Sequence, residues 1–300
     1  MNKVLVTGGA GFIGSHLVDA LINHGYKVGI IDNLSTGLKT NLNPRAEFFE
    51  RVDVRDKEKI LEIFKKFLPE YVFHLAAQTR LRRSVENPVE DAQINIIGSL
   101  NVFNYAKEGG AKKIILFSSA GVYSSECNVP TAEIEEVKPF SPYGASKLAA
   151  EIYLRTSFFN SGLDSVILRP SNVYGPRQNS EGEAGVVAKF LGKEQPVIYG
   201  SGEHTRDYIY VKDVVSACLL AMQDDIKGIF NVGTGVETSA NNLFQKICDI
   251  KGDMNVSRGP EVKEQARSAL NSTKLRERGW KPEYSLEQGL RETVEWFRNH

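Results

Sequence analysis

A glycine-rich turn between a short apolar segment and a helical pattern constrains the fold of this chain more than any other feature. Residues 4–7 read as a buried strand, and they run directly into the spacing Gly-x-x-Gly-x-x-Gly on Gly8, Gly11 and Gly14. A helical pattern follows over residues 15–23. Glycines at such a turn let the backbone approach a pyrophosphate, and the N–H groups of the helix N-terminus attract an anion. The turn therefore predicts a strand–turn–helix unit that binds a phosphate-containing ligand.

An acidic residue ends the next apolar segment. Residues 28–31 are apolar, and Asp32 follows them. A carboxylate about twenty residues after a glycine turn is placed to hydrogen-bond the 2′-hydroxyl of a ribose, which favours NAD over NADP. Glycine-rich turns without a ligand also occur in many loops. The strand, the helix and the acid in this order favour a dinucleotide site over such a structural turn.

Composition excludes several classes of partner. The chain has 300 residues, and its 37 lysines and arginines balance 37 aspartates and glutamates, so we expect neither nucleic acid nor a membrane as partner. Three widely spaced cysteines, Cys127, Cys218 and Cys248, form no Cys-x-x-Cys pair, which predicts a reducing compartment without disulfides or a metal site. The sequence shows no signal-peptide pattern and no apolar run of about 20 residues. We therefore expect a cytoplasmic protein.

Strand-like and helix-like segments alternate through the first 170 residues. Such alternation predicts an α/β fold, in which helices cover both faces of a parallel sheet and ligands bind outside the carboxyl ends of the strands. The predicted strands are residues 4–7, 28–32, 48–49, 71–75, 114–117 and 165–168, and predicted helices are residues 57–67, 91–107 and 143–159.

The pattern changes after Pro170. Glycine, proline and polar residues dominate residues 171–203 around a predicted helix at 186–191, and residues 239–300 read as short helices with a polar linker at 252–266. Between them lie a predicted strand, helix and strand, which we expect to rejoin the first sheet. The expected organisation is an NAD-binding domain at 1–171, joined by 205–234, and a smaller, discontinuous C-terminal substrate lobe at 172–204 and 235–300.

A tyrosine and a lysine lie four residues apart at the start of a predicted helix. Ser141 suits the N-cap and Pro142 the first helical position, so Tyr143 and Lys147 share one helical face. A tyrosine has a pKa of about 10 and needs a shift of about 3 units to act as a base near neutral pH. A nearby ammonium or a positive nicotinamide ring favours the phenolate. The alternative is an amphipathic helix with a packed tyrosine and a solvated lysine.

A third polar residue follows the predicted strand at 114–117. This strand ends in Ser118 and Ser119, at the edge of the sheet where ligands bind. The Ser119 hydroxyl can hydrogen-bond a substrate oxygen that loses its proton to Tyr143. A helix cap or turn residue is the alternative for Ser119. Ser119, Tyr143 and Lys147 are the predicted catalytic residues.

Seven motifs occur in one order along the chain. They are TGGAGFIGSH at 7–16, DNL at 32–34, HLAAQ at 74–78, SSAGVY at 118–123, YGASK at 143–147, RPSNVYGPR at 169–177 and RDYI at 206–209. With these motifs the chain resembles the extended short-chain dehydrogenase/reductase superfamily, and within it the NAD-dependent nucleotide-sugar epimerases, nearest to the UDP-glucose 4-epimerases. The resemblance covers nearly the whole chain and weakens after about Gly252.

The resemblance implies a Rossmann-type doubly wound parallel sheet and an isomerase that epimerises a UDP-sugar at C4, with UDP-galactose and UDP-glucose as the first pair. Tyr143 would take the proton of the sugar 4-hydroxyl, and the C4 hydride would pass to NAD. The transient 4-keto sugar would then turn over and take the hydride back on its other face. NAD would be tightly bound and regenerated in each turnover. Lys147 would anchor the nicotinamide ribose and lower the pKa of Tyr143.

The resemblance also implies binding residues and a homodimer formed by the predicted helices at 91–107 and 143–159. The implied cofactor-binding residues are Gly8, Gly11, Phe12, Ile13, Gly14, Asp32, Asn33, Asp53, Val54, Ala76, Ala77, Gln78, Asn95, Tyr143 and Lys147. The implied substrate-binding residues are Ser119, Asn172, Val186, Arg206 and Arg267. Arg258 is a second candidate for the role of Arg267, because the Arg-x-Gly-acid pattern of the family is rearranged here.

Other activities occur on the same scaffold. Dehydratases of the family carry an Asp-Glu pair directly after the serine or threonine, and decarboxylating relatives carry a glutamate there. Here Ala120 and Gly121 follow Ser119, which disfavours both reactions. Epimerisation of a UDP-N-acetylhexosamine or a UDP-uronate stays open, as does a dehydrogenase that releases its cofactor. A non-catalytic NAD-binding regulator is the alternative of a different class, because fold does not imply function.

Overall fold

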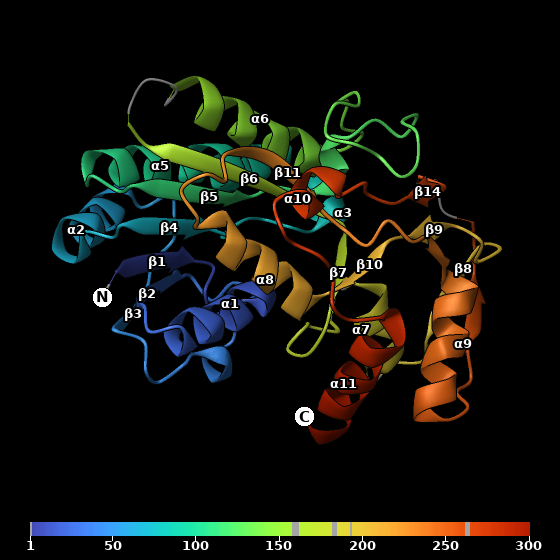
Figure 1. Ribbon diagram of the computed structural model, residues 1–300. Helices are drawn as coiled ribbons and strands as arrows, with labels where there is room; N and C mark the ends of the chain where they lie inside the picture. The colour runs from blue at the N-terminus through green and yellow to red at the C-terminus, as the bar shows by residue number, and fades with distance from the viewer. Residues whose placement is uncertain (1, 158–161, 182–184, 193, 262–264) are drawn as a thin grey trace. The chain divides into compact units, whose positions relative to one another are not determined.

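The computed structural model describes residues 2–157, 162–181, 185–192, 194–261 and 265–300, which form two compact units (Figure 1). The first unit consists of Met1–Ser124, Val137–Arg169 and Val215–Phe230. The second unit consists of Ser125–Glu136, Pro170–Val214 and Asn231–His300. Both units are therefore discontinuous along the chain.

A seven-stranded sheet forms the centre of the first unit, in the order β11-β6-β5-β4-β1-β2-β3. From β6 to β3 every neighbouring pair is parallel. The strands are β1 (Lys3–Thr7), β2 (Lys27–Asp32), β3 (Phe48–Arg51), β4 (Tyr71–His74), β5 (Lys113–Phe117), β6 (Asp164–Pro170) and β11 (Gly228–Val232). The strand order reverses between β1 and β4, the point where open parallel sheets bind ligands. The predicted doubly wound α/β fold is confirmed.

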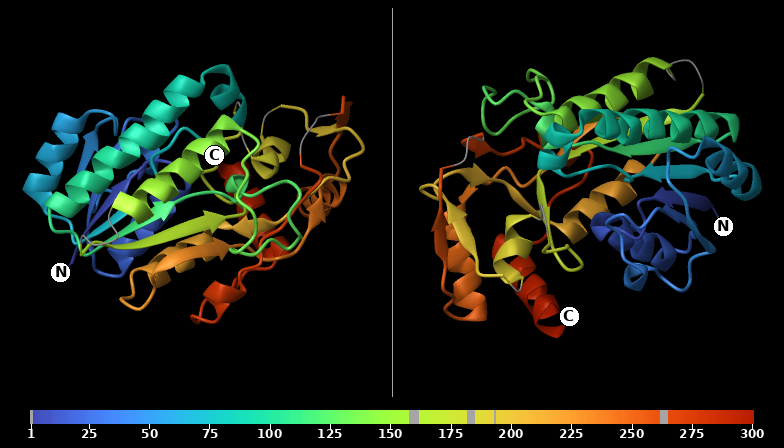
Figure 2. Two further views of the ribbon diagram at one scale, coloured as in Figure 1. Left: turned by 90° about the horizontal axis from the view of Figure 1, so that it is seen from above. Right: turned by 180° about the vertical axis from the view of Figure 1, so that it is seen from behind.

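Helices cover both faces of this sheet (Figures 1 and 2). One face carries α2, α5 and α6, and the other carries α1 and the part of α8 that belongs to the unit. The bounds are α1 (Phe12–Asn23), η1 (Lys39–Asn41), α2 (Lys57–Phe67), α3 (Leu81–Glu86), α4 (Pro88–Ala92), η2 (Gln93–Gly98), α5 (Ser99–Glu108), η3 (Ala120–Val122), α6 (Pro142–Ser157) and α8 (Val211–Ala221).

Two predicted helices differ from the observed elements. The helix predicted at 91–107 is divided, because the π-helical turn η2 joins α4 to α5. The helix predicted at 143–159 begins one residue earlier, at Pro142, and residues 158–159 lie outside the described part of the chain.

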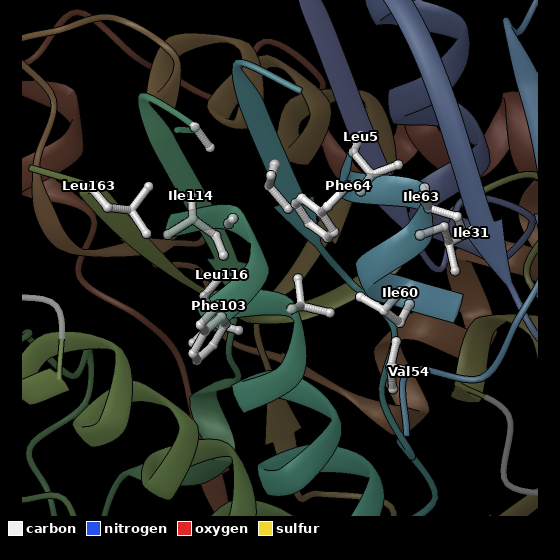
Figure 3. Close-up of a cluster of buried hydrophobic side chains, with 14 of the residues drawn as sticks. Leu5, Ile31, Val54, Ile60, Ile63, Phe64, Phe103, Ile114, Leu116 and Leu163 are labelled. Carbon is white, nitrogen blue, oxygen red and sulfur yellow. The ribbon is translucent and has the colours of Figure 1, made fainter. Parts of the chain in front are cut away.

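A cluster of buried apolar side chains fixes the helices to the first face of the sheet (Figure 3). Leu5 and Ile114 come from the strands, and Phe64 and Phe103 come from α2 and α5; all four are at most 1% exposed. Burial of one such side chain stabilises the fold by about 1.5–3 kcal/mol. The cluster therefore holds the parallel strands and the covering helices in fixed positions, and with them the carboxyl ends of the strands.

Within the described residues, the second unit contains three small sheets and four helices. Its strands are β7 (Asn172–Tyr174), β8 (Val197–Tyr199), β9 (Thr205–Arg206), β10 (Tyr208–Tyr210), β12 (Thr238–Ser239), β13 (Ser257–Gly259) and β14 (Arg267–Ser268), and its helices are α7 (Val186–Leu191), α9 (Ala240–Lys251), α10 (Thr273–Arg276) and α11 (Leu286–Asn299). None of the helices in the described part of the chain is long and apolar enough to cross a membrane.

The structure corrects two expectations about this part of the chain. Of the strands predicted to rejoin the first sheet, only β11 does so. Strand β10 instead pairs with β7, and the ring centroids of Tyr174 and Tyr210 on these strands lie 5.5 Å apart. The predicted polar linker at 252–266 contains β13, which pairs with β8, while its residues 262–264 lie outside the described part.

Candidate active site

The glycine turn leaves no space for side chains at two of its positions. Gly8 has φ +74°, and a Cβ there would lie 2.8 Å from the backbone N of Ala76. A Cβ on Gly14 would lie 2.1 Å from the Gly8 carbonyl oxygen. Gly11 precedes α1 in an extended conformation, and among the described residues no side chain caps the start of this helix with a hydrogen bond. A helix N-terminus without a side-chain cap thus follows the end of β1, which is the arrangement that binds a pyrophosphate.

Asp32 is held in place by the same turn. Its carboxylate accepts hydrogen bonds from the N–H groups of Ala10 (3.0 Å) and Leu34 (2.8 Å). Burial raises the pKa of Asp32, and these backbone hydrogen bonds oppose the shift. The carboxylate is thus fixed at the carboxyl end of β2, beside the glycine turn.

Asn33 and Asp53 form the next part of the site. Asn33 donates to Asp53 at 2.9 Å, and Arg55 Nε donates to the other carboxylate oxygen at 2.8 Å. The hydrogen bond from Arg55 lowers the pKa of Asp53 to about 2, so the group is a carboxylate at neutral pH. Val54 is buried, and a Cβ on Gly98 of η2 would lie 2.5 Å from its side chain. The structure therefore brings Asp32, Asn33, Asp53 and Val54 to one end of the sheet.

The segment after β4 is locked by an asparagine side chain. Asn95 accepts the N–H of Gln78 at 2.8 Å and donates to the Gln78 carbonyl oxygen at 3.0 Å. Ala76 N lies 3.3 Å from the Thr7 hydroxyl. Asn95 lies in the π-helical turn η2, and such turns are frequent at functional sites. Ala76, Ala77 and Gln78 thus follow β4 beside the glycine turn.

Ser119 and Tyr143 lie together where η3 meets α6. Ser141 caps α6 as the sequence predicts, because its hydroxyl accepts the N–H of Gly144 at 3.1 Å. A Cβ on Gly144 would lie 2.3 Å from the Gly121 carbonyl oxygen, so only glycine allows this approach of α6 to η3. A Cβ on Gly121 would lie 3.4 Å from Ser119 Oγ and 3.9 Å from Tyr143 Cε1. Lys147, one turn later, is buried.

Burial dominates the protonation of the two groups on α6. It raises the pKa of Tyr143, and a hydrogen bond with Ser119 works in the opposite direction. It lowers the pKa of Lys147 to about 8, and the charges of Glu151 and Asp91 oppose this shift. In this structure a hydrogen bond with Ser119 lowers the pKa of Tyr143, and the lowering expected from Lys147 stays a prediction.

A buried ion pair beneath these residues is not evident from the sequence. Arg169 at the end of β6 donates to Glu151 of α6 through Nη2 at 2.5 Å and Nε at 2.9 Å. Ser118 also donates to Glu151, and the Arg169 guanidinium lies 4.8 Å from the Tyr123 ring centroid. The one signal in the sequence is that Glu151 repeats the spacing of Tyr143 and Lys147 along the helix. This pair fixes α6 to the ends of β5 and β6.

The predicted substrate residues Asn172, Val186, Arg206 and Arg267 belong to the second unit. Arg267 pairs with Thr205 in the parallel register of β14 and β9, so it shares a face with Thr205, and Arg206 lies on the opposite face. Arg267 donates to Glu237 at 2.9 and 2.5 Å.

The remaining predicted residues of this unit lie on other elements. Arg258 is exposed and donates to Asn241 at 3.0 Å. Asn172 begins β7, and Val186 begins α7.

Comparisons with known proteins agree with this geometry. The model of the NAD dependent epimerase/dehydratase family matches residues 4–233. The UDP-glucose 4-epimerase of Mycolicibacterium smegmatis is 42% identical over 310 residues, which cover 99% of each chain. The solved structure of the Thermotoga maritima UDP-glucose 4-epimerase with UDP-glucose is 47% identical, with a TM-score of 0.95 and 99% of both chains covered. The Thermus thermophilus UDP-glucose 4-epimerase in complex with NAD is 40% identical, with a TM-score of 0.92 and 99% of both chains covered. The chain therefore belongs to the NAD-dependent epimerase/dehydratase family.

Proposed function

We propose that the protein epimerises a UDP-sugar at C4, with UDP-galactose and UDP-glucose as the first candidate pair. The turn after β5 carries the proposal: Ser119 lies beside Tyr143, while the next two residues, Ala120 and Gly121, have no group that transfers a proton. Elimination of water needs an additional acid and base, whereas epimerisation at C4 needs one base. The UDP-glucose 4-epimerases among the relatives support the same reaction.

The residues of the first unit fit NAD. The cradle at Gly8 and Gly14, which a Cβ would fill, admits a pyrophosphate against the first turn of α1. We assign the ribose of adenosine to Asp32 and Asn33, and the adenine to Asp53 and Val54. The other residues proposed to line the cofactor are Phe12, Ile13, Ala76, Ala77, Gln78, Asn95, Tyr143 and Lys147. When bound, NAD supplies the acceptor, and then the donor, of the C4 hydride.

In the proposed reaction Tyr143 is the base. Its phenolate oxygen accepts the proton of the sugar 4-hydroxyl while the C4–H bond breaks and a C4 carbonyl forms. When the hydride returns to the other face of C4, Tyr143 gives the proton back to the oxygen. Ser119 Oγ accepts the N–H of Gly121 at 3.0 Å, so its one hydroxyl proton is directed toward Tyr143 in this structure and would turn to the substrate oxygen when the sugar is bound. The protein and its cofactor are unchanged after the turnover.

For the diphosphate we propose Arg206, since a planar guanidinium matches phosphate oxygens. Arg267 is not part of this proposal, because its guanidinium faces the other side of the sheet and is bound by Glu237. Asn172 and the start of α7 at Val186 are the further proposed contacts of the nucleotide.

We also propose that the protein is a cytoplasmic homodimer. Large apolar side chains are at least 44% exposed on four neighbouring elements, α3, α4, η2 and α6, which supports a second copy on this face. These side chains are Leu81, Val85, Val89, Ile97, Ile152 and Tyr153. The free cysteines support a reducing compartment.

Incubation of the purified protein with UDP-galactose tests the proposed function, with UDP-glucose followed by NMR. The N-acetylhexosamine and uronate analogues are run in parallel, because the same machinery would act on them. Conversion of none of these sugars contradicts the proposal. NAD that stays with the protein through purification separates an epimerase from a dehydrogenase that releases its cofactor.

A further inference from the structure

Asp91 of α4 is a buried carboxylate that the proposed reaction does not use. It is 1% exposed. Its Oδ1 accepts hydrogen bonds from Gln78 Nε2 at 2.7 Å and Asn95 Nδ2 at 3.2 Å. Its Oδ2 is also buried and has no hydrogen-bond partner among the described residues. A buried carboxylate oxygen without a partner is costly, so this placement needs an explanation beyond the packing of α4.

Hydrogen bonds connect Asp91 through Asn95 to α6, the helix that carries Tyr143 and Lys147. Asn95 Nδ2 also donates to Ser146 Oγ at 3.0 Å, and Ser146 donates to the carbonyl oxygen of Tyr143 at 3.0 Å. One side chain, Asn95, therefore connects Asp91 to the turn of α6 that holds Tyr143 and Lys147.

The other charged groups around Lys147 are paired, neutral or exposed. Glu151 is bound by Arg169 and Ser118. Burial lowers the pKa of His74 to about 3, so this side chain is neutral at pH 7. The charged side chains on α3 and α5, which also pack on α6, are exposed: Arg82, Arg83, Glu86, Lys107 and Glu108. Among the described carboxylates on α6 and on the helices packed against it, Asp91 has a buried oxygen without a hydrogen-bond partner.

We infer that Asp91 is a positioning residue for Tyr143 and Lys147: it holds Gln78 and Asn95, Asn95 in turn binds Ser146 of α6, and the carboxylate of Asp91 adds to the negative charge that Glu151 supplies near the Lys147 ammonium. The catalytic meaning of this inference rests on the proposed function. A buried lysine loses its proton easily unless a negative charge lies nearby. The charge of Asp91 raises the pKa of Lys147 and of Tyr143 alike. The pH at which Tyr143 loses its proton and the pH at which Lys147 loses its proton therefore both depend on Asp91.

The pH dependence of kcat/KM in the NAD-loaded protein tests the inference. Activity needs a Tyr143 phenolate and a Lys147 ammonium, so the profile has an acid limb and an alkaline limb. Asp91→Asn keeps an acceptor for Gln78 and Asn95 but removes the charge. Both limbs should move to lower pH, by about half a unit to one unit. A second readout is the phenolate absorbance of Tyr143, obtained by difference from Tyr143→Phe, which should titrate at correspondingly lower pH in Asp91→Asn.

Two controls separate charge from structure. Glu86→Gln removes an exposed carboxylate and should leave both limbs in place. Ser146→Ala breaks the connection to α6 but keeps the charge of Asp91, so it should lower kcat without moving either limb. A loss of rate in Asp91→Asn without displacement of the limbs or of the phenolate titration overturns the inference, and so does an equal displacement in Ser146→Ala.

If Asp91→Asn does not fold, Asp91→Ser is measured in its place, because it removes the charge with a smaller polar side chain. If the wild-type protein converts no UDP-sugar, the proposed function fails. The phenolate titration then still decides whether Asp91 sets the protonation of Tyr143.

Discussion

Arg206 and Arg267 project from opposite faces of the same small sheet, because Arg267 is in register with Thr205. Glu237 binds the guanidinium of Arg267, and this hydrogen bond lowers the pKa of Glu237 to about 2. The two arginines therefore cannot hold one diphosphate from one side of this sheet.

The first prediction follows from this arrangement. Arg206→Ala should weaken the binding of UDP by about 10- to 100-fold, because charged hydrogen bonds of about 1.5–3 kcal/mol are lost. Arg267→Ala is the matched control and should change the affinity by less than about twofold. Titration calorimetry with UDP measures both. Equal losses of UDP affinity in the two variants would show that the face of the sheet does not decide which arginine binds the diphosphate.

The second prediction concerns the base. Tyr143→Phe should lower turnover of the UDP-sugar by at least about a hundredfold, the usual minimum for an acid–base group. NAD content should stay at the wild-type level, because the phenyl ring keeps the packing between α6 and Gly121. NMR of the sugar and absorbance of the released cofactor give the two values. Turnover close to that of the wild type would refute the assignment of Tyr143.

The third prediction concerns the glycine turn. Gly14→Ala should abolish the retention of NAD, because its Cβ would lie 2.1 Å from the Gly8 carbonyl oxygen and force the turn apart. Gly25→Ala is the control, since no atom lies within 4 Å of its Cβ and only the backbone strain at φ +82° is added. NAD per protomer after gel filtration is the measurement. Equal NAD contents in Gly14→Ala and the wild type would contradict the steric argument.

The fourth prediction concerns His74 and pH. Ser99 donates to the Asn95 carbonyl oxygen, so it accepts from His74 Nε2–H at 2.9 Å, and Thr7 donates to Nδ1 at 2.7 Å. Burial lowers the pKa of His74 from 6.5 to about 3, so between these values the unfolded chain binds the extra proton. The contribution of His74 to stability is complete above pH 6.5 and falls by up to about 1.4 kcal/mol per unit below it.

Urea midpoints from about pH 7 to about pH 4.5 test this prediction, since they span the range in which the unfolded chain takes up the proton. The wild type should lose its advantage over His74→Gln as the pH falls, because glutamine does not titrate. A constant difference between the two midpoints would contradict a neutral, buried His74.

The sequence predicts this site best where the signal is local. The glycine turn, the Ser141 cap and the spacing from Tyr143 to Lys147 each lie within a few residues, and backbone geometry alone connects them to a helix start. The parallel sheet with helices on both faces follows from alternation and from the rules for such sheets, whereas the order of its strands comes from the structure.

Contacts that join distant parts of the chain could not be predicted in this way. The pair of Glu151 and Arg169 and the connection from Asp91 to Ser146 depend on how α4 and α6 pack. The face on which Arg267 lies depends on the register of a two-residue strand, β14, and a shift of one residue would reverse it.

The chain passes between the two units five times, after Ser124, Glu136, Arg169, Val214 and Phe230. Neither unit can therefore be excised as a single contiguous fragment, and no single cut releases one with all its elements. Exchange of the whole second unit between related proteins would therefore need five simultaneous junctions rather than one gene fusion.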